Sequence, residues 1–182
     1  MEVVKRWYFF LPIRVWYAFP RHHWVGGGSA NLGLLRPPQA PFSALRRRCW
    51  TADRRRQRGL PTHLLCPLYG LAPETLDHIS LHCSYAQELW AHVVARLGLP
   101  NIVPVLNVGI NDWWLLASTR VAKPQRKQLN SLVMLVLHVL WLERNDRVFQ
   151  GNSLQVAATA SKVLDEWGSW LSYRGVSLGE ID

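Results

Sequence analysis

Apolar residues recur with helical spacing along the second half of the chain, and this pattern predicts three helices. Ser84 opens the first, with capping-box spacing to Gln87, and Gly98 ends it. The second helix spans 124–149, and its middle is apolar on almost every side, which predicts burial on most faces. Charged residues near its end are expected to return that helix to water. Ser153 is the expected N-cap of the third helix.

Shorter elements are predicted ahead of these helices. Thr51 is expected to cap a short helix that runs through Arg58, and Gly59 has the character of the residue that follows a helix end. Residues 74–81 are consistent with a second short helix after a loop over 61–73. Because no stretch alternates convincingly between apolar and polar residues, the predicted fold class is mainly α, in a small helical domain.

The first part of the chain has a different pattern. Residues 1–41 hold many aromatic side chains without a sustained period, together with a glycine triplet and several prolines that break regular structure. We therefore expect an irregular N-terminal arm that is unrelated to the rest of the chain or disordered. The remaining residues are interpreted as a domain over 42–98 and a helical C-terminal region over 99–182.

The distribution of charge also distinguishes the first part of the chain from the rest. The 182 residues carry 21 Lys and Arg against 12 Asp and Glu, but residues 1–60 have a net charge of +10 and residues 61–182 a net charge of −1. Two arginine triplets cover all sides of a helix, which favours contact with a polyanion over an internally paired face. The candidate nucleic-acid-binding residues are Arg46, Arg47, Arg48, Trp50, Arg54, Arg55, Arg56 and Arg58.

Trp50 lies between the two triplets, where its ring can stack on an unpaired base. The expected partner is therefore RNA or DNA, bound without sequence preference through its phosphates. The alternative is that the arginines form a solvated helix face with no nucleic-acid role.

Other features bear on the compartment. Three cysteines cannot form a disulfide framework, and an odd count fits a reducing, intracellular compartment, either nucleus or cytoplasm. The uncharged run within the long apolar helix covers 15 residues, 128–142. Since a bilayer span needs about 20 residues, no membrane association is expected.

One cluster of residues has the composition of a zinc site, because zinc prefers thiolate and imidazole ligands in a tetrahedron. Its candidate metal ligands are Cys66, His78 and Cys83. Tyr69 occupies the position at which a second cysteine would complete a Cys-x2-Cys-x8-His-x4-Cys pattern, and a neutral phenol is a poor zinc ligand. His63 and His82 are alternative fourth ligands. The two cysteines can also be interpreted as small buried hydrophobic residues.

The order of these motifs resembles the zinc-binding domain that follows the polymerase in reverse transcriptases of plant non-LTR, LINE-type retrotransposons. The resemblance is carried by Arg48–Arg54 with its Thr-Ala-Asp, Leu65–Leu68 with its Cys-Pro, Pro73–His78 with its Glu-Thr-x-x-His, Cys83 and Trp90. Trp141–Phe149, with the pattern W-x-E-R-N-x-R-x-F, also resembles a stretch that follows this domain.

The resemblance implies a short zinc-knuckle-like loop around Cys66 and a retrotransposon origin. Tyr69 departs from the family's ligand pattern, so zinc binding is expected to be weak or lost. No polymerase-like acidic pair or catalytic triad motif is evident, and we expect a non-catalytic protein. The alternative interpretation is a non-functional helical remnant or a protein-interaction module.

Overall fold

The structure is a computed structural model that describes residues 49–174, all within one compact unit that begins at Pro38. The expected arm over 1–41 and the first arginine triplet, Arg46–Arg48, lie outside the described residues. The predicted mainly helical fold class is confirmed. The helical elements are α3 (Ala52–Gln57), η1 (His78–His82), α4 (Ser84–Arg96), η2 (Pro100–Ile102), α5 (Ile110–Thr119), η3 (Lys123–Gln125), α6 (Arg126–Phe149) and α7 (Val156–Arg174).

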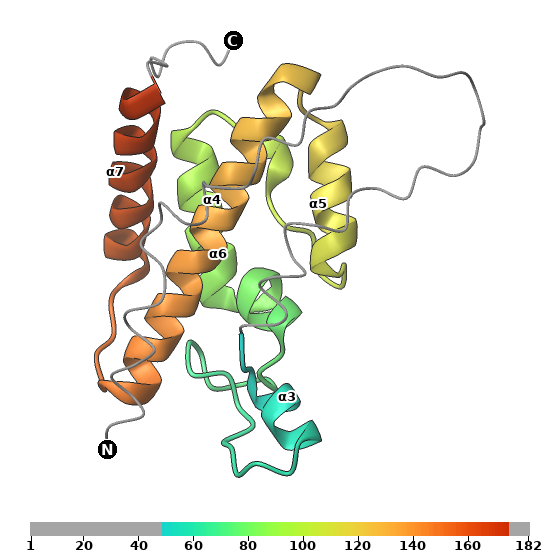
Figure 1. The fold of residues 1–182 in the computed structure, drawn as a ribbon, viewed down its shortest axis with the longest axis vertical. Helices are drawn as coiled ribbons and strands as arrows, with labels where there is room; N and C mark the ends of the chain where they lie inside the picture. The colour runs from blue at the N-terminus through green and yellow to red at the C-terminus, as the bar shows by residue number, and fades with distance from the viewer. Residues whose placement is uncertain (1–48, 175–182) are drawn as a thin grey trace, which may run out of the picture. The chain divides into compact units, whose positions relative to one another are not determined.

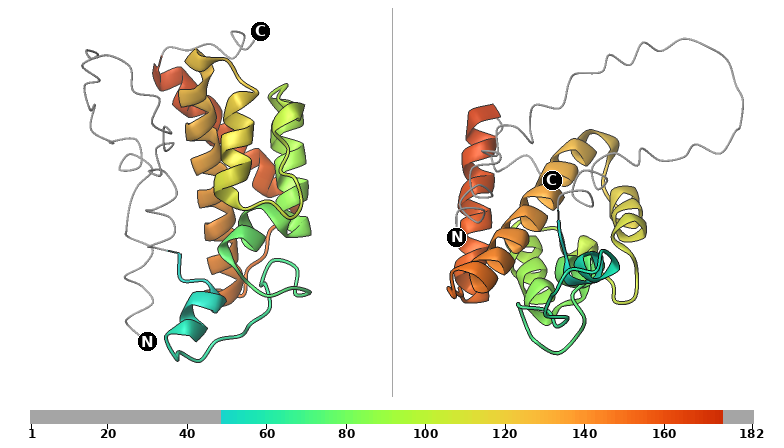
Figure 2. Two further views of the ribbon diagram at one scale, coloured as in Figure 1. Left: turned by 90° about the vertical axis from the view of Figure 1, so that its right-hand side faces the viewer. Right: turned by 60° about the horizontal axis from the view of Figure 1, so that its bottom comes forward.

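Helix α6 is the longest element, and it runs through the middle of the view in Figure 1, between α7 and α5. Helix α7 runs antiparallel to α6 and also packs against α4, while η1 contacts both α4 and α6. Figure 2 shows that α3 lies at the end of the unit where α6 finishes. None of the helices between residues 49 and 174 has the length and apolar character needed to cross a bilayer.

The core contains a tryptophan pair that joins α4 to α5. Trp90 and Trp113 are almost fully buried, and their ring centroids lie 5.0 Å apart with the planes tilted by 60°. The Trp90 indole N–H donates to the carbonyl of Ser80 at 2.9 Å. This bond satisfies the one polar atom of a large side chain that is otherwise surrounded by apolar atoms, and it fixes η1 against α4.

Glycine ends two helices at the predicted positions. Gly59 follows α3 with φ +71°, and Gly98 follows the C-cap of α4 with φ +67°. At both ends, the N–H of the residue after the glycine bonds to a carbonyl five residues earlier: Leu60 to Arg55 at 3.0 Å and Leu99 to Val94 at 2.8 Å. This is the Schellman arrangement, which needs a left-handed residue and therefore favours glycine.

Two predicted helix starts are wrong. Cys83, not Ser84, is the N-cap of α4, and Ser84 is an exposed first helical residue. The expected capping box does not form, because the Gln87 side chain donates instead to the carbonyl of Leu81 in η1. Helix α7 begins at Val156 rather than directly after Ser153.

The later start of α7 has a cause in the segment before it. The N–H of Leu154 donates to Glu143 Oε1 at 2.9 Å, and its carbonyl accepts from Arg147 at 3.2 Å and from the Tyr85 hydroxyl at 3.1 Å. These bonds hold Leu154 in an extended segment against α6. Because its backbone groups are satisfied there, the helix can begin only after it.

The largest difference between the structure and the sequence-based prediction lies at the C-terminal end of α6. Glu143 and Arg144 were expected to face water, yet each is only 3% exposed. Arg144 donates to Glu74 through Nε at 2.9 Å and Nη2 at 3.0 Å, a two-bond pair that joins residues 70 positions apart. Its guanidinium also lies over the ring of Trp141 at 5.1 Å. Glu143 and Arg144, at this end of α6, are therefore part of the core.

We predict that Glu74→Gln lowers the free energy of unfolding by about 3–5 kcal/mol, because it leaves the Arg144 charge buried without its carboxylate. Chemical denaturation followed by circular dichroism measures the loss. Glu88→Gln is the matched control, since Glu88 is 61% exposed beside His92, and it is expected to change stability by less than about 0.5 kcal/mol. A loss below about 1 kcal/mol for Glu74→Gln contradicts the importance assigned to this pair.

Candidate metal centre

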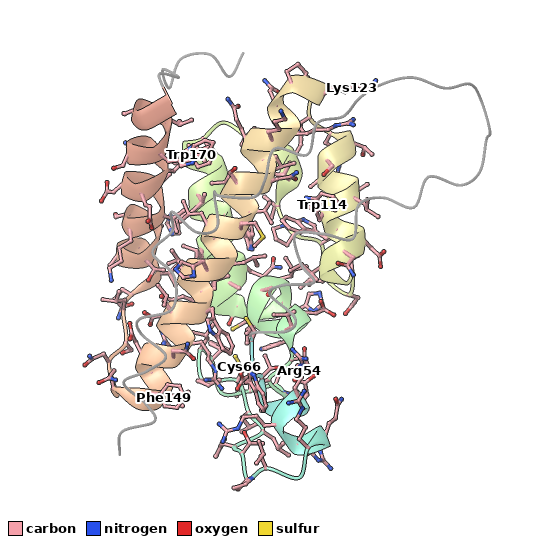
Figure 3. All side chains as sticks on the ribbon, in the orientation of Figure 1. Arg54, Cys66, Trp114, Lys123, Phe149 and Trp170 are labelled. Atoms are coloured by element: carbon pink, nitrogen blue, oxygen red, sulfur yellow. The ribbon has the colours of Figure 1, made fainter. Side chains whose placement is uncertain are left out.

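Three predicted ligands converge at the end of the unit that holds α3. The ligand atoms of Cys66, His78 and Cys83 all lie within 4.8 Å of one another. The two sulfur atoms are 3.8 Å apart, and both cysteines are almost fully buried. Cys66 is labelled in the lower part of the view in Figure 3. The residues that sequence spacing selected therefore form one cluster of soft donors.

Cys66 is placed by a tight turn over residues 66–70, which we call the knuckle. The Cys66 N–H donates to the carbonyl of Ala72 at 2.8 Å, and its carbonyl accepts from the N–H of Gly70 at 2.7 Å. Gly70 has φ +81°, which permits this sharp return. Backbone N–H groups of Leu68 and Tyr69 also bond to the Cys66 sulfur. These two N–H groups act to lower the pKa of Cys66, against larger effects that raise it.

His78 and Cys83 are brought together by an unusual helical turn. They are five positions apart in the sequence, and in a regular α-helix that spacing places side chains about 140° apart. In η1, however, the Cys83 N–H bonds to the His78 carbonyl at 2.7 Å, an i→i+5 bond that defines a π-helical turn. This wider turn returns the chain to its starting side after five residues. The two ligands consequently face the same point.

The position of Cys83 at the start of α4 helps to lower the pKa of its thiol. The pKa of Cys83 is lowered by the hydrogen bond from the Cys66 thiol and by the N–H groups of Tyr85 and Ala86 in the first helical turn, while burial opposes the shift. The pKa of Cys66 is raised, chiefly because its thiol donates that hydrogen bond. A metal ion bound by both sulfur atoms would displace the proton of this hydrogen bond.

The three donors fit a zinc ion on two observations. A tetrahedral ion with Zn–S bonds of about 2.3 Å separates two sulfur ligands by about 3.8 Å, which is the distance between the Cys66 and Cys83 sulfurs. In addition, the buried His78 Nε2 has no hydrogen-bond partner within residues 49–174. A buried imidazole nitrogen without a partner is costly unless it meets a ligand, and a metal ion beside the two thiolates supplies one.

The fourth corner of the tetrahedron receives no side chain from the residues proposed for it. Tyr69 is 58% exposed. Neither His63 nor His82 joins the ligand cluster. His63 is exposed, and His82 Nε2 lies 2.9 Å from the carbonyl of Val108. The suggestion that one of these histidines replaces the missing cysteine is therefore wrong.

Arg147 supports the knuckle from outside the ligand cluster. It donates to the Leu68 carbonyl at 2.7 Å, to Glu143 Oε1 at 2.8 Å and to the Leu154 carbonyl. Its guanidinium also lies 4.6 Å from the centre of the Tyr85 ring. Sequence reasoning missed this role because it assigned Glu143, Arg144 and Arg147 to a solvent-facing helix end. The sequence feature that could have indicated this role is the W-x-E-R-N-x-R-x-F motif, with its fixed spacing of charged residues.

The described arginines of the basic segment lie on and beside α3. Arg54 is half-buried and donates to the Cys49 carbonyl at 3.2 Å, while Arg55 donates to the Pro61 carbonyl at 3.1 Å. Arg58 lies 4.4 Å from the centre of the half-buried Trp50 ring. Arg56 is exposed. The Trp50 ring, which is predicted to stack on a base, is therefore already in contact with Arg58 of the same segment.

Comparison with known proteins agrees with this geometry. The family described as zinc-binding in reverse transcriptase matches residues 39–90, a range that contains the three ligands, Tyr69 and α3. No curated protein and no solved structure matches the chain. Residues 39–90, which are less than half of the chain, are therefore similar to the zinc-binding domains of reverse transcriptase.

Proposed function

We propose that this chain is a non-catalytic, retrotransposon-derived protein that binds zinc weakly and nucleic acid without sequence preference. The observation that supports the zinc part is the cluster of Cys66, His78 and Cys83, in which the two sulfur atoms have the spacing of a tetrahedral ion and the His78 Nε2 has no hydrogen-bond partner among the described residues. The family of residues 39–90 supports the retrotransposon origin. Within this proposal the zinc ion orders the knuckle and does no chemistry.

The affinity for zinc is expected to be low because the protein supplies three ligands. A complete structural zinc site contributes about 10–16 kcal/mol of apparent binding free energy at neutral pH. An equal share for one of four ligands is about 3 kcal/mol, or about a hundredfold in affinity. The exposed Tyr69 phenol does not supply that share.

The nucleic-acid part of the proposal rests on charge and on how the arginines are held. Arg55, Arg56 and Arg58 surround one short helix. Each guanidinium has five N–H donors, so the single bond from Arg55 to Pro61 leaves donors for a phosphate. The contacts of Arg54 and Arg58 hold their side chains in place, which reduces the entropy lost when a backbone phosphate binds.

The same contacts favour a second candidate function. Arg54, Arg55 and Arg58 each have a partner within the chain, which is also what a purely structural basic segment requires. In that case the domain is an interaction module with no nucleic-acid role. Salt dependence of binding distinguishes the two, since phosphate contacts release counterions and structural arginines do not.

We predict that Tyr69→Cys tightens zinc binding by about a hundredfold, because the knuckle already has the backbone of a two-cysteine turn. Competition with a chromophoric chelator measures the affinity. Tyr69→Ala is the control, since it removes the phenol without adding a ligand, and it should match the parent. Equal affinity for Tyr69→Cys and the parent contradicts the placement of residue 69 at the fourth corner.

A second pair of variants tests the ligand set. Cys66→Ala removes a ligand and should abolish detectable zinc binding. Cys49→Ala removes the buried cysteine outside the cluster and should leave zinc binding unchanged. Zinc bound equally by both variants excludes the proposed site.

We predict that Arg56→Gln with Arg58→Gln flattens the dependence of log K on log salt by up to about 1.8 for duplex DNA, at about 0.9 per phosphate contact. Fluorescence anisotropy with two unrelated sequences at several salt concentrations measures the slope. Both sequences should weaken alike, because arginine–phosphate contacts do not read bases.

The control for this prediction is Arg96→Gln with Lys162→Gln, which removes the same charge from exposed positions on α4 and α7. It should leave the slope close to that of the parent. If both double variants change the slope equally, general charge explains binding. If neither does, the interaction-module candidate is the better one.

A further inference from the structure

We propose that the exposed side chains of residues 60–71, together with Arg55, Arg56 and Arg58 of the neighbouring basic segment, bind single-stranded nucleic acid. We call these residues the loop surface. Within it, the ring of Tyr69 stacks on an unpaired base while the arginines contact phosphates. This inference rests on the proposed nucleic-acid binding and deepens it, because it names the class of nucleic acid and a residue that contacts the bases.

Large apolar side chains are exposed at several positions of this one loop. Eleven large hydrophobic residues of the described chain are exposed, and five of them fall between residues 60 and 71. These five are Leu60, Leu64, Leu65, Tyr69 and Leu71. A single exposed leucine is ordinary, whereas a group of exposed apolar side chains marks a surface that contacts another molecule.

Hydrogen bonds hold the beginning of this loop against the C-terminal end of α3. The Leu60 N–H donates to the Arg55 carbonyl at 3.0 Å, and the Arg55 side chain donates to the Pro61 carbonyl at 3.1 Å. Arg56 and Arg58 of the same segment are exposed. The first apolar residue of the loop surface therefore lies directly beside its arginines.

Glu74 anchors the other end of the loop to the same helix. Its N–H donates to the Leu64 carbonyl at 2.8 Å, and its carbonyl accepts from the N–H of Asp53, in the first turn of α3, at 3.3 Å. The knuckle, which carries Tyr69, lies between Leu64 and Glu74 in the chain. Because the loop is bonded to α3 at both ends, its apolar side chains and the arginines belong to one surface.

The charge of this surface favours a polyanion. Residues 54–73 contain four arginines and no Asp or Glu. A single strand of nucleic acid combines phosphates with bases whose flat faces are accessible, and proteins bind it through basic grooves and stacking side chains. A duplex offers the phosphates but keeps its bases stacked inside, so it matches the arginines and not the apolar side chains. The loop surface therefore complements a single strand better than a duplex.

Tyr69 is the aromatic residue best suited to contact a base. Its side chain is 58% exposed, more than any other aromatic side chain that the structure describes. The candidate from the sequence, Trp50, is half-buried, and Arg58 lies 4.4 Å from the centre of its ring. The bonds that hold the knuckle are made by backbone groups such as the Leu68 carbonyl, so the Tyr69 ring can stack on a base without breaking them.

Fluorescence anisotropy with the full chain tests this inference, with a labelled mixed-sequence DNA strand and the same strand annealed to its complement as the two probes. The duplex has the higher density of phosphates, so arginines alone favour the duplex. We expect the parent to bind the single strand more tightly. Tyr69→Ala should weaken single-strand binding by at least about fivefold, the lower limit for loss of one base–aromatic stack, and change duplex binding by less than about twofold.

Three further variants serve as comparisons. Tyr69→Phe keeps the ring and removes only the hydroxyl, so it should bind both probes like the parent. Leu71→Ala changes the most exposed residue of the loop surface, at 78%, and should weaken binding of the single strand alone. Leu116→Ala is its control, because Leu116 is 40% exposed on α5, outside the loop surface, and its loss should change neither affinity.

The salt dependence separates stacking from a general loss of structure. Stacking releases no counterions, so Tyr69→Ala should weaken single-strand binding without changing the slope of log K against log salt. Arg56→Gln with Arg58→Gln should flatten that slope. A flattened slope in Tyr69→Ala overturns the role of Tyr69 in stacking, because the substitution then acts through the arginines.

The outcomes separate this inference from the function on which it rests. If the parent binds neither probe, the proposed nucleic-acid binding itself is wrong. If the parent binds the duplex at least as tightly as the strand and Tyr69→Ala matches it, the arginines bind phosphates and only the stacking surface is overturned. Equal weakening of both probes by Tyr69→Ala also overturns it. Binding of the parent to anionic phosphatidylserine vesicles, lost in Tyr69→Ala, overturns it in favour of a membrane surface.

Discussion

A guanidinium–carboxylate pair removed from water is the interaction on which the rest of this unit depends. Arg144 of α6 and Glu74 of the loop before η1 meet through two hydrogen bonds, and their side chains are 4% and 1% exposed. Burial of two charges is unfavourable unless the geometry and the remaining hydrogen bonds are good. Here the Arg144 Nη1 also donates to Asn145 Oδ1, and aromatic rings of Trp141 and Phe149 lie beside the guanidinium.

Glu74 also connects this pair to α3 and to the loop before the knuckle. Its carbonyl accepts from the N–H of Asp53 in the first turn of α3, and its own N–H donates to the Leu64 carbonyl at the base of the knuckle loop. The residues that follow it continue the connection. The Thr75 hydroxyl accepts from the His78 N–H, and Asp77 accepts from the N–H of Ile110 at the start of α5. The Glu-Thr-x-x-His motif, which contains the candidate ligand His78, is thus bonded to α3, to the loop before the knuckle, to η1 and to the start of α5.

The helices were largely predictable because their signals are local. Apolar spacing and the glycines after α3 and α4 depend on neighbours in the sequence, and the structure follows them. The ligand cluster was also predictable, since thiol and imidazole residues have a distinctive spacing. The burial of Glu143 and Arg144 was not, because a charged side chain faces water unless a distant partner neutralises it. Glu74, 70 residues earlier, supplies that partner.

The start of α4 was misplaced for a related reason. Serine is a better N-cap than cysteine by propensity, so Ser84 was preferred. The π-turn of η1 decides otherwise, because its i→i+5 bond places Cys83 at the helix start with its sulfur toward the first-turn N–H groups. A thiolate is suited to that position, since the partial positive charge of the helix N-terminus stabilises it. The feature that local propensity misjudged is therefore the one that the metal centre requires.

The same support explains how the centre keeps its shape with Tyr69 at a ligand position. The knuckle backbone is fixed through the Leu68 carbonyl by Arg147, and Arg147 is fixed by Glu143 of the same helix. Ligand geometry here is set by hydrogen bonds from α6, which lies beyond the segment 39–90 that the family covers. The bonds that shape the knuckle therefore do not use the side chain at position 69. Helix α3 is joined to Glu74 through the Asp53 N–H, a bond that involves none of the three candidate ligands.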